Sequence, residues 1–67
     1  MNEDWVKVYT SQFPYRAEII KSLLEDNEIE CVIMNKQDSS LLFGEIELYV
    51  ERENIFKAKQ LIESEKI

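Results

Sequence analysis

Carboxylates dominate the side chains of this sequence that could take part in catalysis or bind a ligand. Its 67 residues include fourteen Asp and Glu, one Cys and no His. A nucleophilic Cys needs a neighbouring base, usually His, and tetrahedral zinc sites also draw on His and Cys. What remains is the chemistry of carboxylates, which act as acid and base pairs or as oxygen ligands for Ca²⁺ and Mg²⁺. Their placement therefore decides whether the sequence contains an active site.

Three of these carboxylates fall on one face of a predicted strand. Glu45, Glu47, Tyr49 and Glu51 alternate with Ile46, Leu48 and Val50, so three of the four residues on one side are acidic. In an antiparallel sheet with one solvated face, the apolar set points to the core and the acidic set to solvent. No Asp-x-Asp-x-Asp-Gly calcium loop occurs elsewhere in the sequence. The pattern predicts a solvated strand face rather than a catalytic pair, so we expect no enzyme activity, no metal and no cofactor.

The net charge and the lengths of the apolar runs exclude several kinds of partner and indicate where in the cell the protein is found. The net charge is -6 and the pI is near 4.5, and an acidic surface opposes the attraction to phosphates on which nucleic-acid binding depends. The longest apolar runs, 31–34 and 41–43, are far shorter than the ~20 residues of a membrane span. The acidic amino terminus does not resemble a secretory signal. We expect a single cytoplasmic domain over residues 1–67 that binds neither nucleic acid nor membrane.

Three segments have the alternation of strands, namely 5–10, 29–35 and 45–50. The residues that would face the core are Val6, Val8, Ile29, Cys31, Ile33, Ile46, Leu48 and Val50. The residues that would face away from it include Trp5, Lys7, Tyr9, Val32, Met34 and Tyr49. Inward placement makes Cys31 a small core hydrophobe with a raised pKa rather than a nucleophile.

Two segments have the spacing of amphipathic helices. The first covers 15–27, with Pro14 in its first turn, Ser11 as a candidate cap, and Asn27, which tolerates a left-handed backbone, at its end. The second begins near residue 53 or 54 and runs close to the terminus. The apolar stripe of the first helix is Ala17, Ile20, Leu23 and Leu24, extended by Phe13. The stripe of the second is Ile55, Ala58, Leu61 and Ile62.

The order β-α-β-β-α predicts an α+β fold in which both helices cover one face of a three-stranded sheet. A right-handed crossover between the first two strands, followed by a hairpin, gives the strand order 1-3-2 of a split β-α-β unit. This is a truncated ferredoxin-like sandwich, because residues 63–67 look like a helix end and not like the fourth strand. Strand one is therefore expected to be an exposed edge, which proteins usually cover, charge or pair with another chain.

A glycine followed by alternating Glu and apolar residues and then Tyr-Val, at 44–50, is the most specific motif in the sequence. Shorter segments accompany it, namely 6–9, Ala17-Glu18, Leu23-Leu24-Glu25, Ile29-Glu30 and Lys57-Ala58. Together they resemble a family of small bacterial domains of unknown function described as putative prokaryotic signal-transducing proteins. The resemblance implies a PII-like, ferredoxin-like fold and a role in signalling. It does not extend to nucleotide binding, because the chain has one Gly and only Lys36 in the corresponding hairpin loop.

The sheet face without helices is the first candidate site. Its candidate interface residues are Trp5, Lys7, Tyr9, Val32, Met34 and Tyr49. Phe56 is a further candidate interface residue off the stripe of the second helix, where it would cover a loop, meet a partner or lie in water. Large aromatic residues are enriched at interfaces, and a contiguous apolar patch usually marks a binding surface. The alternative is that these residues are simply good strand formers on a half-solvated face. A cross-strand pair between Lys7 and Glu47 would stabilise the sheet without a functional charge.

The connection between the second and third strands is the second candidate site, formed by Asp38, Ser39, Ser40, Leu41, Leu42 and Phe43. Its apolar half either packs over the sheet edge as a minor core or recognises a partner. We predict a non-catalytic regulatory or protein-interaction module that forms a homodimer through strand one and the open sheet face. One alternative is a domain that senses a small ligand, an amino acid or a nucleotide. A more distant one is an RRM-like binder that stacks bases on its sheet.

Overall fold

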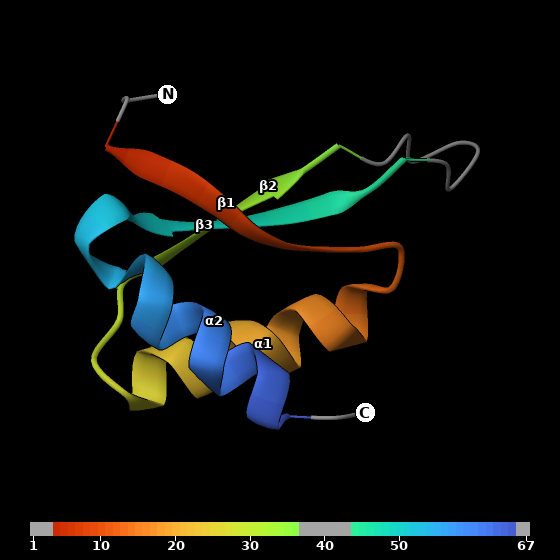
Figure 1. Cartoon of the computed structure of the whole chain (residues 1–67). Coiled ribbons are helices and arrows are strands. Elements are labelled where there is room, and N and C mark those ends of the chain that lie inside the picture. The colour runs from red at the N-terminus through yellow and green to blue at the C-terminus, as the bar shows by residue number, and fades with distance from the viewer. Residues whose placement is uncertain (1–3, 37–43, 66–67) are drawn as a thin grey trace.

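A three-stranded sheet is covered on one face by two helices in the computed structural model, which describes residues 4–36 and 44–65 (Figure 1). The elements are β1 (Trp5–Ser11), α1 (Pro14–Asp26), β2 (Cys31–Asn35), β3 (Ile46–Glu51), a 3₁₀ turn (Arg52–Asn54) and α2 (Ile55–Ser64). The α+β class and the predicted β-α-β-β-α order are therefore confirmed, in an arrangement consistent with a ferredoxin-like fold.

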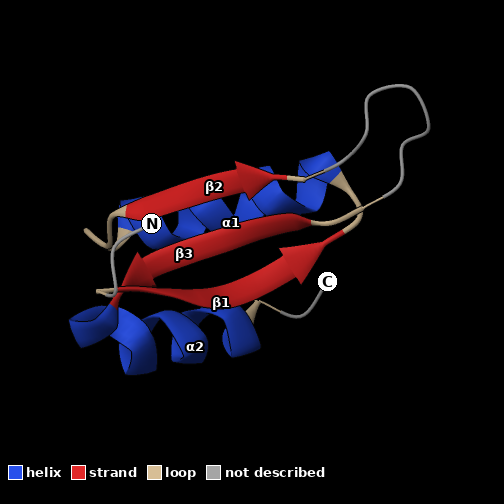
Figure 2. Ribbon diagram, turned by 90° about the horizontal axis from the view of Figure 1, so that it is seen from above, coloured by secondary structure: helices blue, strands red, loops and turns tan. Residues whose placement is uncertain are grey.

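The sheet has the predicted order, with β3 between β1 and β2 and antiparallel to both. β2 pairs with β3 without interruption, from Cys31 opposite Val50 to Asn35 opposite Ile46. Figure 2 looks down on the sheet from the side without helices, with α1 running beneath β2 and β3 and α2 beside and beneath β1. Within the described part of the chain, β1 and β2 are the two edges of this sheet.

The inward face of β3 forms the centre of the hydrophobic core. Leu48 and Val50 are fully buried. The other buried members of the core are Ala17, Ile20, Leu24, Ile29, Cys31, Ile46 and Ala58. Phe13, expected to extend the stripe of the first helix, is instead 48 % exposed. It occupies the extended N-cap position before α1, where helical spacing no longer applies.

The ends of α1 differ from the expected caps. The Ser11 hydroxyl accepts a 3.0 Å hydrogen bond from the Phe13 N–H and donates one of 3.2 Å to the Phe13 carbonyl, so it closes the turn rather than capping the helix. The helix does stop beside Asn27, but the left-handed residue is Glu28, with φ of 63°. Asn27 is the C-cap and has a negative φ, while the N–H groups of Glu28 and Ile29 bond to the carbonyls of Glu25 and Leu24. This pattern places the left-handed residue one position after the cap.

A β-bulge in β1 changes the face to which Tyr9 belongs. Lys7 lies opposite Tyr49, whereas Tyr9 lies opposite Leu48, so β1 has one extra residue at this point. Because residues directly opposite each other share a face, Tyr9 points to the helix side with Leu48 and packs, like Val8, against the core. The prediction that Tyr9 shares the outer face with Trp5 is therefore wrong. Strict alternation cannot anticipate an inserted residue, which reverses the face of every residue that follows it.

Candidate functional site

The sheet face without helices brings together residues from all three strands. The pairing places Lys7, Tyr49 and Val32 in one row across the sheet. The next row consists of Thr10, Glu47 and Met34, and Trp5 lies opposite Glu51 on the same side. We call the surface formed by these eight residues the open face; it is the side turned to the viewer in Figure 2.

Glu47 lies near the centre of the open face and is only 8 % exposed. Its Oε1 accepts a 2.8 Å hydrogen bond from the Tyr49 hydroxyl and lies 3.1 Å from Lys36 Nζ. Its Oε2 lies 3.4 Å from Lys7 Nζ. The two lysines come from opposite sides of β3, since Lys7 belongs to β1 and Lys36 directly follows β2. We call these four residues the Glu47 cluster.

The contacts within the Glu47 cluster fix its state of charge. The Tyr49 hydroxyl, followed by the Lys36 ammonium, holds the pKa of the Glu47 carboxyl below its ordinary value. The hydrogen bonds to Glu47 in turn raise the pKa of Tyr49 and the pKa of Lys36. Each shift moves a titration away from neutral pH, whereas a general acid or base works best with a pKa near the operating pH. The cluster is therefore suited to holding side chains in place rather than to transferring protons.

The burial of Glu47 corrects the expectation of a uniformly solvated acidic strand face. Glu45 is exposed, but Glu47 belongs to the row in which both neighbouring strands contribute covering side chains. The predicted pair with Lys7 is present, whereas the contacts of Lys36 and Tyr49 with Glu47 were not foreseen. The sequence does contain a carboxylate on the central strand and a lysine in each flanking segment, which could have indicated these contacts. The strand register is needed to predict them, because it decides which lysines lie beside Glu47.

Five of the seven candidate interface residues lie together on the open face, namely Trp5, Lys7, Val32, Met34 and Tyr49. Of these, Lys7 is exposed and the other four are half-buried. Tyr9 points to the opposite side, and Phe56 lies on α2 in the helix layer, where it is 85 % exposed. The prediction that Phe56 lies off the core stripe is thus confirmed, but it does not join the open face. The candidate loop residues 38–43 lie outside the described residues.

Cys31 lies on the other side of the sheet, within the core. Burial, with a smaller contribution from the negative charge of Glu25, raises the pKa of its thiol to about 11. Since the thiolate is the nucleophile, this thiol is inert at neutral pH, as the sequence indicated. Among residues 4–36 and 44–65, no three side chains of His, Cys, Asp or Glu are grouped so as to hold a metal ion. Over the same residues, no helix is long and apolar enough to cross a bilayer.

Comparison with known proteins relates the chain to one family. The model of the family described as Putative prokaryotic signal transducing protein matches residues 5–66. The match runs from the first residue of β1 past the end of α2 and so includes every residue of the open face. No curated protein and no solved structure matches the chain.

Proposed function

Because this chain belongs to the family described as Putative prokaryotic signal transducing protein, we propose that it is a non-catalytic regulatory module that self-associates through the open face. One observation carries the proposal. Trp5, Val32, Met34 and Tyr49 come together from three strands on a sheet face that neither helix covers. Aromatic residues and Met are enriched at protein interfaces relative to the rest of the surface.

Charge supports a second copy of the chain as the occupant of this face. With a net charge of -6, two copies repel each other in most relative orientations. The charged residues of the open face are Lys7, Glu47 and Glu51, and with the adjoining Lys36 their charges sum to zero. Like-charge contacts across an interface are costly. Repulsion between copies is therefore smallest where the apolar residues also lie.

The geometry of β1 supports stacking of two sheets rather than pairing of their edges. Proteins protect edge strands with bulges, lysines or a covering helix. β1 has the bulge beside Val8 and an exposed Lys7, and Lys59 of α2 lines a hollow along the same stretch. In the proposed dimer, β1 contributes the side chains of Trp5 and Lys7, and the two sheets stack at about 10 Å.

The size of the open face limits the area that the dimer can bury. Three strands spaced about 4.8 Å apart and about 20 Å long present roughly 300 Å² in projection. Two such faces bury less than about 1,200 Å² in total, which is the range of weak and transient complexes. A dissociation constant in the micromolar range is consistent with a module whose association responds to cellular concentration.

Sedimentation velocity between about 5 and 500 µM tests this proposal, because that range brackets micromolar dissociation constants. The wild type should shift from monomer to dimer, and Val32→Arg should weaken the dimer at least about tenfold. Phe56→Arg introduces the same charge at an exposed position of α2 and should leave association unchanged. A wild type that stays monomeric throughout would refute the proposal. So would a Phe56→Arg variant that dissociates as Val32→Arg does.

A further inference from the structure

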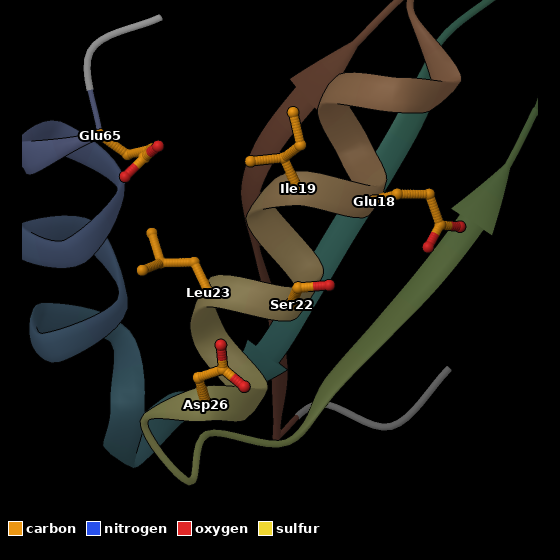
Figure 3. A pocket seen from close by; sticks show the side chains of 6 residues that line it. All are labelled: Glu18, Ile19, Ser22, Leu23, Asp26 and Glu65. Atoms are coloured by element: carbon orange, nitrogen blue, oxygen red, sulfur yellow. The ribbon is translucent and has the colours of Figure 1, made fainter.

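A shallow hollow lies between α1 and the carboxyl end of α2, in the helix layer and not on the open face (Figure 3). Its volume is about 390 Å³, and its lining residues are Glu18, Ile19, Ser22, Leu23, Asp26 and Glu65. Leu23 and Glu65 extend into the gap between the helices from opposite sides in Figure 3. Ile19 is 41 % exposed, although a large aliphatic side chain is more often buried. Ile19 and Leu23 thus form an apolar strip along α1, in the hollow, that the surrounding side chains do not cover.

The polar lining of the hollow is acidic. Glu18, Asp26 and Glu65 contribute carboxylates, and no Lys or Arg is among the lining residues. Glu18 and Asp26 are eight residues apart on α1, which separates them by about 12 Å along the helix axis. That distance is too long for two ligands of one metal ion, which bind within about 2.6 Å of it. It corresponds instead to two turns of another helix lying along the strip.

We propose that this hollow docks an amphipathic helix of a partner protein whose apolar stripe is flanked by Lys or Arg. Ile19 and Leu23 are one turn apart and fit apolar residues of the partner spaced at i and i+3 or i+4. Glu18 and Asp26 fit two basic residues about seven or eight positions apart on the partner helix. Glu65 provides an anion on the opposite wall. The partner is thereby defined by its spacing of apolar and basic side chains.

The three carboxylates of the hollow favour a basic helix over a second copy of this chain, a bilayer or a small ligand as its binding partner. A second copy of this chain docked on the same surface would place three carboxylates against three more, and like charges in contact are costly. A bilayer with anionic headgroups is repelled in the same way. A small ligand would find no buried donor, since Ser22 is exposed and the other polar lining groups are carboxylates. The proposal goes beyond self-association, because this surface lies in the other layer of the fold.

Titration with a synthetic helical peptide of about four turns tests the proposal. The probe has Leu at i, i+3 and i+7 and Lys at flanking positions two turns apart; a control peptide has the same composition in scrambled order. With ¹⁵N-labelled protein, the amide shifts should concentrate on Glu18, Ile19, Leu23 and Asp26. Binding should weaken between about 50 and 500 mM salt, because salt screens charges separated by more than a few ångströms.

Matched variants show which carboxylates bind the probe peptide. Glu18→Lys and Asp26→Lys should each weaken binding of the probe about tenfold, whereas Glu53→Lys, which makes the same change of net charge outside the hollow, should not. Equal weakening by all three, or equal binding of the scrambled peptide, would show attraction to net charge alone and overturn the proposal. Val32→Arg should bind the probe as the wild type does, since that change affects only the open face. The probe experiment therefore succeeds or fails independently of the proposed dimer.

Discussion

Raising the pH from about 8 to about 10 should destabilise the folded protein through the thiol of Cys31. This side chain is 7 % exposed and lies opposite Val50 on the core side of the sheet. Burial raises its pKa from 9.0 to about 11. The folded protein therefore holds the thiol proton more tightly than the unfolded chain does. The resulting stability is fully present below pH 9 and is lost as the pH rises towards 11.

The size of the effect follows from these two pKa values. Between about pH 8 and pH 10 the loss is roughly 1.3 kcal/mol, and the limit at higher pH is about 2.7 kcal/mol. A chain of 67 residues has a total stability of roughly 3 to 10 kcal/mol, so the loss is a large share of it. With an m-value of about 1 kcal/mol per molar urea, the unfolding midpoint should fall by about 1.3 M.

Urea unfolding followed by the fluorescence of Trp5, for the wild type and Cys31→Ala, measures this loss. The substitution removes a core atom and lowers stability by an amount that does not depend on pH. Tyr49 and Lys36, whose raised pKa values also remove stability at alkaline pH, remain in both proteins. The difference between the two pH dependences therefore belongs to Cys31. Parallel curves between pH 8 and 10 would refute the desolvated thiol and, with it, the inward orientation of Cys31 on β2.

Four further variants have expected outcomes. Glu28→Gly should raise the melting temperature by several degrees, because Glu28 has φ of 63° and a left-handed non-glycine residue costs about 1 kcal/mol; calorimetry showing no increase would contradict this. Tyr9→Ala should lower the unfolding free energy by about 2 kcal/mol and leave sedimentation unchanged, because the bulge turns Tyr9 to the core. Trp5→Ala should weaken association and lower the unfolding free energy by less than Tyr9→Ala does. If Tyr9→Ala weakened association and Trp5→Ala caused the larger loss of stability, the bulge would be contradicted. Tyr49→Phe removes the largest cause of the lowered Glu47 pKa, so that pKa should rise in a carboxyl NMR titration. Since a lowered carboxyl pKa contributes stability that is lost as the pH falls through it, acid unfolding of this variant should begin at a higher pH.

The elements of this fold could be predicted because their residues follow regular periods. The strict alternation around Leu48 identified β3 and its inward face, and Ile20 and Leu24 identified the inner face of α1. A right-handed crossover, a hairpin between the second and third strands and the split β-α-β motif together predicted the strand order that the structure has. The backbone conformations at the ends of the helices were harder to predict from the sequence. The left-handed residue at the end of α1 is Glu28 rather than Asn27, because the last backbone hydrogen bonds of the helix place it one position after the C-cap.

The candidate site was only partly predictable. Alternation placed Trp5, Val32 and Tyr49 on one face correctly, since each lies on the expected side of its strand. It misplaced Tyr9, because an inserted residue in β1 leaves no mark in the hydrophobic pattern. It also treated Glu47 as a solvated charge, although that side chain is covered by its neighbours.

The sequence by itself determined which segments are helices and strands, which side of each is apolar, and the α+β order of the fold. These properties depend on the local periods of the backbone, 2 for a strand and 3.6 for a helix. The tertiary structure decided which further side chains meet around Glu47. The Lys36 ammonium lies 3.1 Å from the Glu47 carboxylate, a contact that the sequence pattern did not predict. Such a contact depends on register, and register is settled by the packing of whole strands against a common core.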